Sequence, residues 1–155
     1  MRQVAAGPLR AHQFLDGVAK TTRTLLPAEL RDFQHRLRGP LVKLHYEDRS
    51  QHYEIWLRRS ASLVELGLHF EASDRDRNAR MLDWFSEELA LIKGMLGERT
   101  EAEPWDRGWT RVHRVLALEP LDLAFQQWLA EQLAQTIELL EPLRREAIEG
   151  LAGLR

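Results

Sequence analysis

Three histidines, His45, His52 and His69, lie in three successive segments in which apolar and polar residues alternate. This alternation predicts half-buried strands that carry all three histidines on their polar face. A short loop centred on residues 48–49 sets His45 opposite His52, and a four-residue turn over residues 59–62 sets His52 opposite His69. Three imidazoles on strands about 4.8 Å apart could converge on one Zn²⁺ ion. The sequence therefore predicts His45, His52 and His69 as metal ligands.

Two acidic residues extend this candidate site. Glu47 and Glu71 each follow a histidine by two positions, so either could supply a fourth ligand or orient an imidazole. No nucleophile accompanies them, so the row predicts a metal-binding protein or a metal-dependent hydrolase to which no catalytic residue is assigned. The alternative is a solvated sheet face that simply requires polar side chains, and the sequence alone favours this alternative.

Other catalytic chemistries lack the residues that they need. The chain has no cysteine, which excludes a disulfide framework, a thiolate metal site and a cysteine nucleophile. A restriction-type nuclease needs a Glu-x-Lys step, but the segments 54–56 and 65–67 have glutamate without the lysine. A phosphate-binding glycine loop, a glycosidase-like carboxylate pair and a serine nucleophile elbow are also missing. The sequence predicts no catalytic residue and no cofactor other than zinc.

Three tryptophans are candidates for contact with a partner. Trp105 and Trp109 flank the polar turn 106–108, and Trp56 lies on the polar side of the second predicted strand. An exposed tryptophan can anchor a peptide or stack on a nucleic-acid base, whereas a buried one pins a loop to the core. We therefore name Trp56, Trp105 and Trp109 as predicted partner-binding residues.

The elements that position these residues follow an α+β pattern. Apolar residues recur at helical spacing over residues 9–26, 73–97 and from Leu121 to about Gly150. The three alternating segments form a meander, and one or two more strands over residues 99–118 separate the last two helices. The sequence predicts an antiparallel sheet of four to five strands in the order helix, three-strand meander, helix, one or two strands, long helix, with helices packed on one face.

Prolines modify two of the predicted helices. Pro27 interrupts the first helix, and Leu30, Phe33 and Leu37 then predict a second helical piece, which makes a bent N-terminal helix. Pro142 is expected to kink or restart the last helix. Both predictions follow from the missing amide hydrogen of proline and from the clash of its ring with the preceding turn.

Length and composition predict one ordinary domain over residues 1–155. The chain is 44% hydrophobic and 30% charged, with a formal net charge of −2. These values fit a globular protein and do not favour a dedicated nucleic-acid binder. Neither the first eight residues nor any later stretch has an apolar run that fits a signal peptide or a membrane span. We expect a cytoplasmic protein with no membrane partner.

Features spread over the C-terminal half carry a family resemblance. They are the strand 64–70, Asn78 and Phe85 on the following helix, Trp105, and the segment 125–129. In these features the chain resembles an uncharacterised bacterial domain family found alone or joined to restriction-type nucleases. The order of elements is also similar to that of type III secretion chaperones, which are small acidic dimers that bind an extended partner segment. The first resemblance implies the fold and brings no activity with it.

Three functions follow from these observations. The leading hypothesis is a non-enzymatic protein-interaction module that acts as a homodimer, because the helix from Leu121 carries more leucine than one sheet face needs and Trp56 and Trp105 are available for contact. The first alternative is metal binding by the histidine row. The second alternative, an accessory DNA-binding domain of a restriction-type system, follows from the family resemblance.

Overall fold

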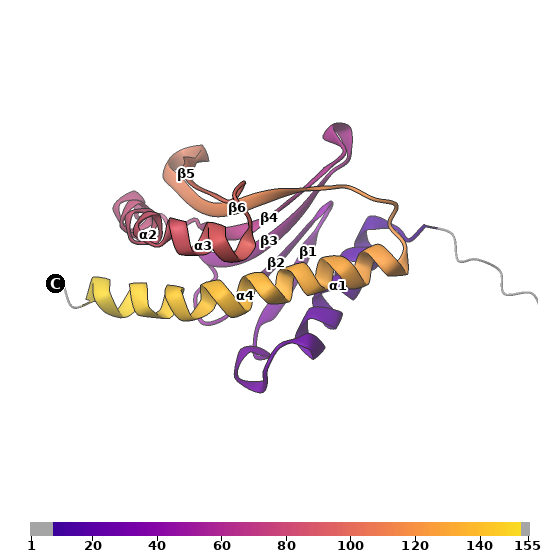
Figure 1. The fold of residues 1–155 in the computed structure, drawn as a ribbon, viewed down its shortest axis with the longest axis horizontal. Helices are drawn as coiled ribbons and strands as arrows, with labels where there is room; N and C mark the ends of the chain where they lie inside the picture. The colour runs from indigo at the N-terminus through magenta and orange to yellow at the C-terminus, as the bar shows by residue number, and fades with distance from the viewer. Residues whose placement is uncertain (1–7, 153–155) are drawn as a thin grey trace, which may run out of the picture.

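The computed structural model describes residues 8–152 and shows one sheet with helices on one side (Figure 1). Residues 1–7 and 153–155 lie outside this range. The prediction that the first eight residues do not form a signal peptide therefore concerns mostly residues that the structure does not describe. The elements are α1 (Ala11–Leu25), β1 (Gln34–Arg38), β2 (Leu41–His45), β3 (Gln51–Arg58), β4 (Leu63–Phe70), α2 (Arg75–Glu87), α3 (Leu89–Leu96), β5 (Glu101–Trp105), β6 (Trp109–Ala117) and α4 (Leu123–Ala152). Short 3-10 turns cover residues 28–30, 59–61 and 106–108.

The six strands form one antiparallel sheet in the order β1-β2-β3-β4-β6-β5. The first four strands are a meander, and the chain then passes through α2 and α3 before β5 and β6 extend the sheet beyond β4. The predicted α+β class and antiparallel sheet are confirmed. The sheet has six strands rather than four or five because the meander begins one strand earlier than the sequence predicted.

The extra strand β1 replaces the predicted second half of a bent N-terminal helix. Phe33 and Leu37 are four residues apart, and an even spacing satisfies the two-residue period of a strand as well as it satisfies a helix. Arg38 pairs with Leu41 across a two-residue turn in which Gly39 has a φ of 56°, so β1 folds back on β2. The prediction of helix over this segment is wrong.

The register of the central strands is confirmed as predicted. His45 lies opposite His52, and His52 lies opposite His69. The β2–β3 turn is held by the Asp48 carboxylate, which accepts hydrogen bonds from the backbone amide and the hydroxyl of Ser50 at 2.9 and 2.7 Å. Such a side-chain-stabilised turn fixes the loop length, and the loop length fixes which residues face one another.

The helical segment after the meander is divided in two. The sequence predicted one helix that ends at Gly97, whereas α2 ends at Glu87 and α3 begins at Leu89. Gly97 does end α3, with a φ of 114° that favours glycine. The last helix, α4, continues as a single element through Pro142, and no helix among residues 8–152 combines the length and the apolar character needed to cross a bilayer.

The helices cover the apolar face of the sheet. Figure 1 shows α4 running along this face, with α1 beside its N-terminal half. The rings of Phe14 on α1 and Phe125 on α4 stack with their centroids 5.5 Å apart, and the ring centroids of Phe85 on α2 and Phe70 on β4 are 5.4 Å apart. Arg114 also lies on this face, where it donates hydrogen bonds to the Leu96 carbonyl and the Gln132 side chain at 3.0 Å. These partners explain why a charged residue interrupts the apolar alternation of β6.

The opposite face of the sheet is polar and yet buried. Its centre carries seven titratable side chains that are at most 9% exposed: His45, His52, Glu54, Glu65, His69, Arg111 and His113. The helices pack on the other side of the sheet, so these side chains are covered mainly by one another and by neighbours on the same face, such as Trp105. Burying charged groups is costly unless they are paired or bind an ion. This face therefore holds the candidate site.

Candidate metal centre

Two imidazoles form the middle of the site. His52 of β3 and His69 of β4 are directly opposite each other in the register, and their rings stack with centroids 5.4 Å apart and an interplanar angle of 13°. They are 3% and 2% exposed. The strand period alone places both rings on the polar face, and the turn at residues 59–61 aligns them.

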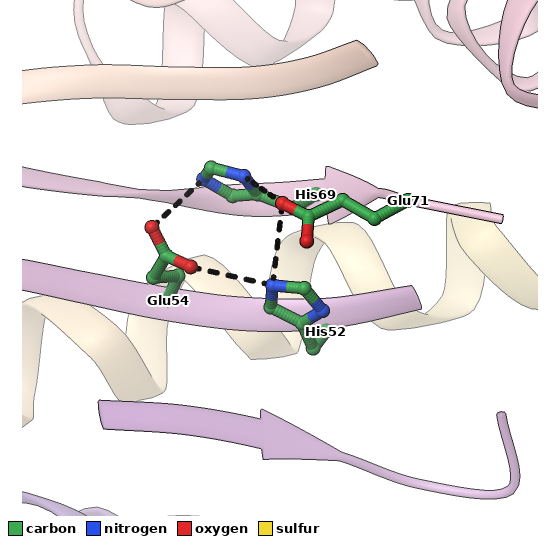
Figure 2. Close-up of side chains that lie close together, drawn as sticks. All are labelled: His52, Glu54, His69 and Glu71. Atoms are coloured by element: carbon green, nitrogen blue, oxygen red, sulfur yellow. Dashed lines mark hydrogen bonds and ion pairs between the residues drawn. The ribbon is translucent and has the colours of Figure 1, made fainter. Parts of the chain in front are cut away.

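Two glutamates lie at opposite ends of the imidazole pair, as Figure 2 shows. Glu54 follows His52 by two residues and Glu71 follows His69 by two residues, so each projects from the same face as its histidine. Because the strands are antiparallel, the two carboxylates flank the stacked rings from opposite directions. One ligand atom from each of the four side chains lies within 4.8 Å of the other three. We call these four residues the His-Glu cluster.

Gly67 lies opposite Glu54 and leaves no room for a side chain between β4 and β6. It is the cross-strand partner of Glu54, and a Cβ atom at Gly67 would lie 2.5 Å from the Val112 carbonyl oxygen and from the His113 Cβ. A side chain at this position would therefore collide with β6. With no side chain directly opposite, the Glu54 carboxylate turns to the diagonal neighbour, and its Oε2 lies 3.7 Å from Nε2 of His69.

The distances within the His-Glu cluster suit a shared cation better than direct hydrogen bonds. His52 Nε2 lies 3.4 Å from Glu54 Oε1 and 3.7 Å from Glu71 Oε2, and His69 Nδ1 lies 3.1 Å from Glu71 Oε2. Hydrogen bonds between nitrogen and oxygen usually measure about 2.7 to 3.2 Å, so most of these contacts are long. Ligands about 2.1 Å from a tetrahedral Zn²⁺ are separated by about 3.4 Å. Three contacts of the cluster, at 3.4 to 3.7 Å, are close to this separation, and one ligand atom from each of the four residues lies within 4.8 Å of the others.

The protonation states of the carboxylates favour cation binding. Burial acts to raise the pKa of Glu54, but the hydrogen bond with His52 and the charges of His69, His52 and Lys43 outweigh it and lower the pKa. The pKa of Glu71 is lowered in the same way, against burial, by His69, His52 and Lys43. Both carboxylates are therefore ionised at neutral pH, as metal ligands must be.

The backbone orients one of the imidazoles. Nδ1 of His52 lies 3.3 Å from the carbonyl oxygen of Arg49. Because a carbonyl oxygen only accepts hydrogen bonds, this contact places a proton on Nδ1 and makes Nε2, which faces the two glutamates, the nitrogen available to a metal ion. In metal-binding histidines the ring nitrogen that does not bind the metal usually donates a hydrogen bond to a group such as a backbone carbonyl.

An ammonium group lies beside the cluster. Nζ of Lys43 is 3.8 Å from Glu54 and 3.9 Å from Glu71, and its side chain is 22% exposed. Both contacts are near the limit for an ion pair, so the Lys43 ammonium group compensates the negative charge of the two carboxylates only in part. It is a natural competitor for a bound metal ion.

The predicted tryptophans lie in different environments. The rings of Trp105 on β5 and His69 are nearly perpendicular, with centroids 5.7 Å apart, and the Arg111 guanidinium lies 4.3 Å from the Trp105 ring centroid. Trp109 pairs with Trp105 in the sheet register, and Trp56 lies on β3 with Arg58 at 4.9 Å. Trp105 therefore forms a wall of the site, and its role in partner binding, like that of Trp56 and Trp109, stays a prediction.

Two of the predicted ligands lie outside the His-Glu cluster. His45 is opposite His52 but is not among the four, and burial, followed by the charges of Arg49 and Arg36, lowers its pKa. Glu47 lies beyond the end of β2, where the strand period no longer holds, and its carboxylate bonds Arg144 of α4 at 2.8 Å. Its suggested role as a ligand is therefore wrong.

Sequence reasoning missed Glu54 as a member of the His-Glu cluster. It assigned this residue only to a cross-strand pair with Lys43, which the register confirms. The signal that could have found it is the repeated His-x-Glu pattern at 52–54 and 69–71, with the two histidines in register.

No protein-family model matches the chain, and neither the curated proteins nor the solved structures contain a match to it. The two resemblances drawn from the sequence therefore stay predictions. The candidate site stands on its own geometry.

Proposed function

We propose that this protein binds a divalent transition-metal ion through His52, Glu54, His69 and Glu71. The observation that carries the proposal is the spacing of four ionisable side chains, buried or nearly so, that lie within 4.8 Å of one another and make mostly long contacts. A purely structural polar cluster at this burial would be expected to close into short hydrogen bonds.

The ligand set favours zinc or a similar ion over magnesium or calcium. Two imidazoles and two carboxylates are the borderline donors that suit Zn²⁺, Fe²⁺ and Mn²⁺, whereas Mg²⁺ and Ca²⁺ prefer oxygen ligands throughout. Four protein ligands also complete a tetrahedral zinc site without an open position. We therefore propose metal binding and assign no hydrolytic step to the site.

The test is equilibrium dialysis of untagged protein against Zn²⁺, with the bound metal measured by elemental analysis. We expect one zinc per chain in the wild type and less than a tenth of that occupancy in His52→Ala and His69→Ala at the same free zinc concentration. His45→Ala is the matched control, because His45 lies on the same face and outside the His-Glu cluster. Equal zinc in wild type and His52→Ala, or loss of zinc only in His45→Ala, would contradict the proposal.

We also propose that the chain self-associates through α3, which would give the homodimer expected from the sequence. The support is the exposure of Leu91 and Met95, which are 51% and 57% exposed and lie one turn apart on the same side of α3. Light scattering coupled to size-exclusion chromatography tests this proposal. The wild type should have the mass of a dimer, and the double variant Leu91→Glu, Met95→Glu the mass of a monomer. A monomeric wild type would refute it.

A further inference from the structure

A small basic pocket opens beside the His-Glu cluster. It lies where the β2–β3 turn meets the ends of β1 and β4, and it has a volume of about 230 Å³. Its lining includes three cationic side chains from three different segments, Arg36 of β1, Lys43 of β2 and Arg49 of the β2–β3 turn, together with His52 and Glu71 of the cluster.

Most of the positive charge in this pocket is not neutralised. Within residues 8–152, neither Arg36 nor Arg49 has a carboxylate within 4.0 Å, and Lys43 reaches its glutamates only at 3.8 and 3.9 Å. The nearest acidic residue on the turn, Asp48, is occupied by Ser50 and by Arg77 of α2, with Arg77 at 3.3 Å. Three cations thus face a cavity whose lining has one carboxylate, that of Glu71.

The turn that carries Arg49 is held in place. The Asp48 carboxylate bonds Ser50, and the backbone amide of Glu71 donates to the Ser50 carbonyl at 2.7 Å. These bonds fix the turn against the end of β4. The position from which the Arg49 side chain leaves the backbone beside the pocket is therefore set by the fold.

We propose that this pocket binds the phosphate group of a small ligand, with Arg36, Lys43 and Arg49 as its counter-charges, next to the metal ion of the proposed function. Only the coupling to the metal rests on the proposed function. Phosphate carries about −1.5 to −2 charges at neutral pH and accepts several hydrogen bonds, which suits two guanidinium groups and an ammonium group. A carboxylate, with one charge, would leave more of the pocket uncompensated.

The size and position of the pocket limit the ligand. Clefts for drug-sized molecules usually measure about 300 to 1,000 Å³, so a pocket of about 230 Å³ admits a phosphate group with a small substituent. His52 and Glu71 belong to both the pocket lining and the His-Glu cluster. A bound phosphate would therefore lie close enough to the metal for each to raise the affinity of the other.

The experiment is titration calorimetry with inorganic phosphate, first on metal-free protein and then on zinc-loaded protein from which excess metal has been removed. Metal-free wild type should bind phosphate, and Arg36→Gln and Arg49→Gln should each weaken binding about tenfold, the loss of one hydrogen bond to a charged group. Arg38→Gln is the matched control, because Arg38 lies on the same strand and outside the pocket. Circular dichroism checks that each variant is folded.

The outcomes separate this inference from the proposed function. Phosphate binding that depends on Arg36 and Arg49 in a protein that takes up no zinc supports the pocket and refutes the metal centre. Zinc uptake with no heat from phosphate refutes the pocket and leaves the metal centre standing. An equal loss of binding in Arg38→Gln, or an Arg36-dependent affinity for duplex DNA without phosphate binding, also overturns the inference.

Discussion

Two buried polar clusters lie back to back on β3, and they differ in how completely they are bonded. On the helix side, Tyr53 and Arg144 both donate to Glu141, and Arg144 also bonds Gln51 and Glu47, all at 2.7 to 3.0 Å. We call these five residues the arginine network. On the other face, the His-Glu cluster begins one residue away at His52, and its contacts measure 3.1 to 3.7 Å.

This difference separates a structural network from a candidate site. The carboxylate of Glu141 is fully buried and accepts hydrogen bonds from three side chains, so nothing further can bind there. The His-Glu cluster is almost as deeply buried and holds more potential ligand atoms than short bonds. Deep burial alone therefore does not single out a candidate site in this protein; the long contacts distinguish the His-Glu cluster from the arginine network.

The largest expected effect is on stability, from the arginine network. Replacing Arg144 by Met leaves the Glu141 carboxylate buried with most of its charge uncompensated, which costs about 3 to 5 kcal/mol. Urea denaturation of wild type and Arg144→Met measures the change. The double variant Arg144→Met, Glu141→Leu should recover much of the loss, because it removes the unpaired charge. A loss below 1 kcal/mol in the single variant would show that the network is not tightly coupled.

The next effect distinguishes the two clusters by their response to metal. Zinc at about 100 times its dissociation constant should stabilise the wild type by about 2.7 kcal/mol, because it binds only the folded chain. Glu71→Gln should lose most of this gain. Glu47→Gln should keep it, because the Glu47 carboxylate belongs to the arginine network and not to the His-Glu cluster. Thermal denaturation with and without zinc measures both. An equal gain in Glu71→Gln would remove Glu71 from the ligand set.

A smaller effect comes from the ammonium group at the edge of the cluster. Lys43→Met should bind zinc about tenfold more tightly, because the ammonium group, 3.8 and 3.9 Å from two of the proposed ligands, repels a divalent cation held by them. The same variant should bind phosphate more weakly. Calorimetry with each ligand gives the two signs, and weaker zinc binding in Lys43→Met would show that the lysine supports the site rather than competing with the metal.

The smallest effect is the acid dependence of stability in metal-free protein. The pKa values of Glu54 and Glu71 are lowered in the folded state, so each stabilises the fold above the unfolded value of about 4.3, and this stabilisation is lost as the pH falls through the folded pKa. Glu54→Gln should therefore show a shallower loss of stability below about pH 4.3. Denaturation curves at several pH values check this slope, and an unchanged slope would contradict the assigned pKa direction.

Local sequence information was sufficient for the central strands. The alternation around Tyr53 and Leu66 predicts which side chains face the core, and the turns predict that His52 faces His69. It was insufficient for β1, because a spacing of four residues fits both a helix and a strand. Pairing with β2 decided between them, and pairing is a contact between segments rather than a property of either one.

The ligand set shows the same limit. Glu71 and Glu47 both follow a histidine by two residues. β2 ends two residues before Glu47, whereas β4 ends only one residue before Glu71, whose backbone amide still donates to the Ser50 carbonyl at 2.7 Å. Sequence patterns do not show where a strand ends to within one residue. The carboxylate of Glu47 consequently reaches Arg144 on the helix side, and Glu54 takes its place in the cluster.

By itself, the sequence determined the alternating faces of the sheet and the alignment of its histidines, because both follow from backbone geometry over a few residues. Only the tertiary structure decided that this polar face is buried, that its contacts stay long, and that three cations gather at one end. Those properties depend on contacts between distant segments, such as that of Trp105 on β5 with His69 on β4 and the meeting of Arg36 of β1 and Arg49 of the β2–β3 turn at one pocket.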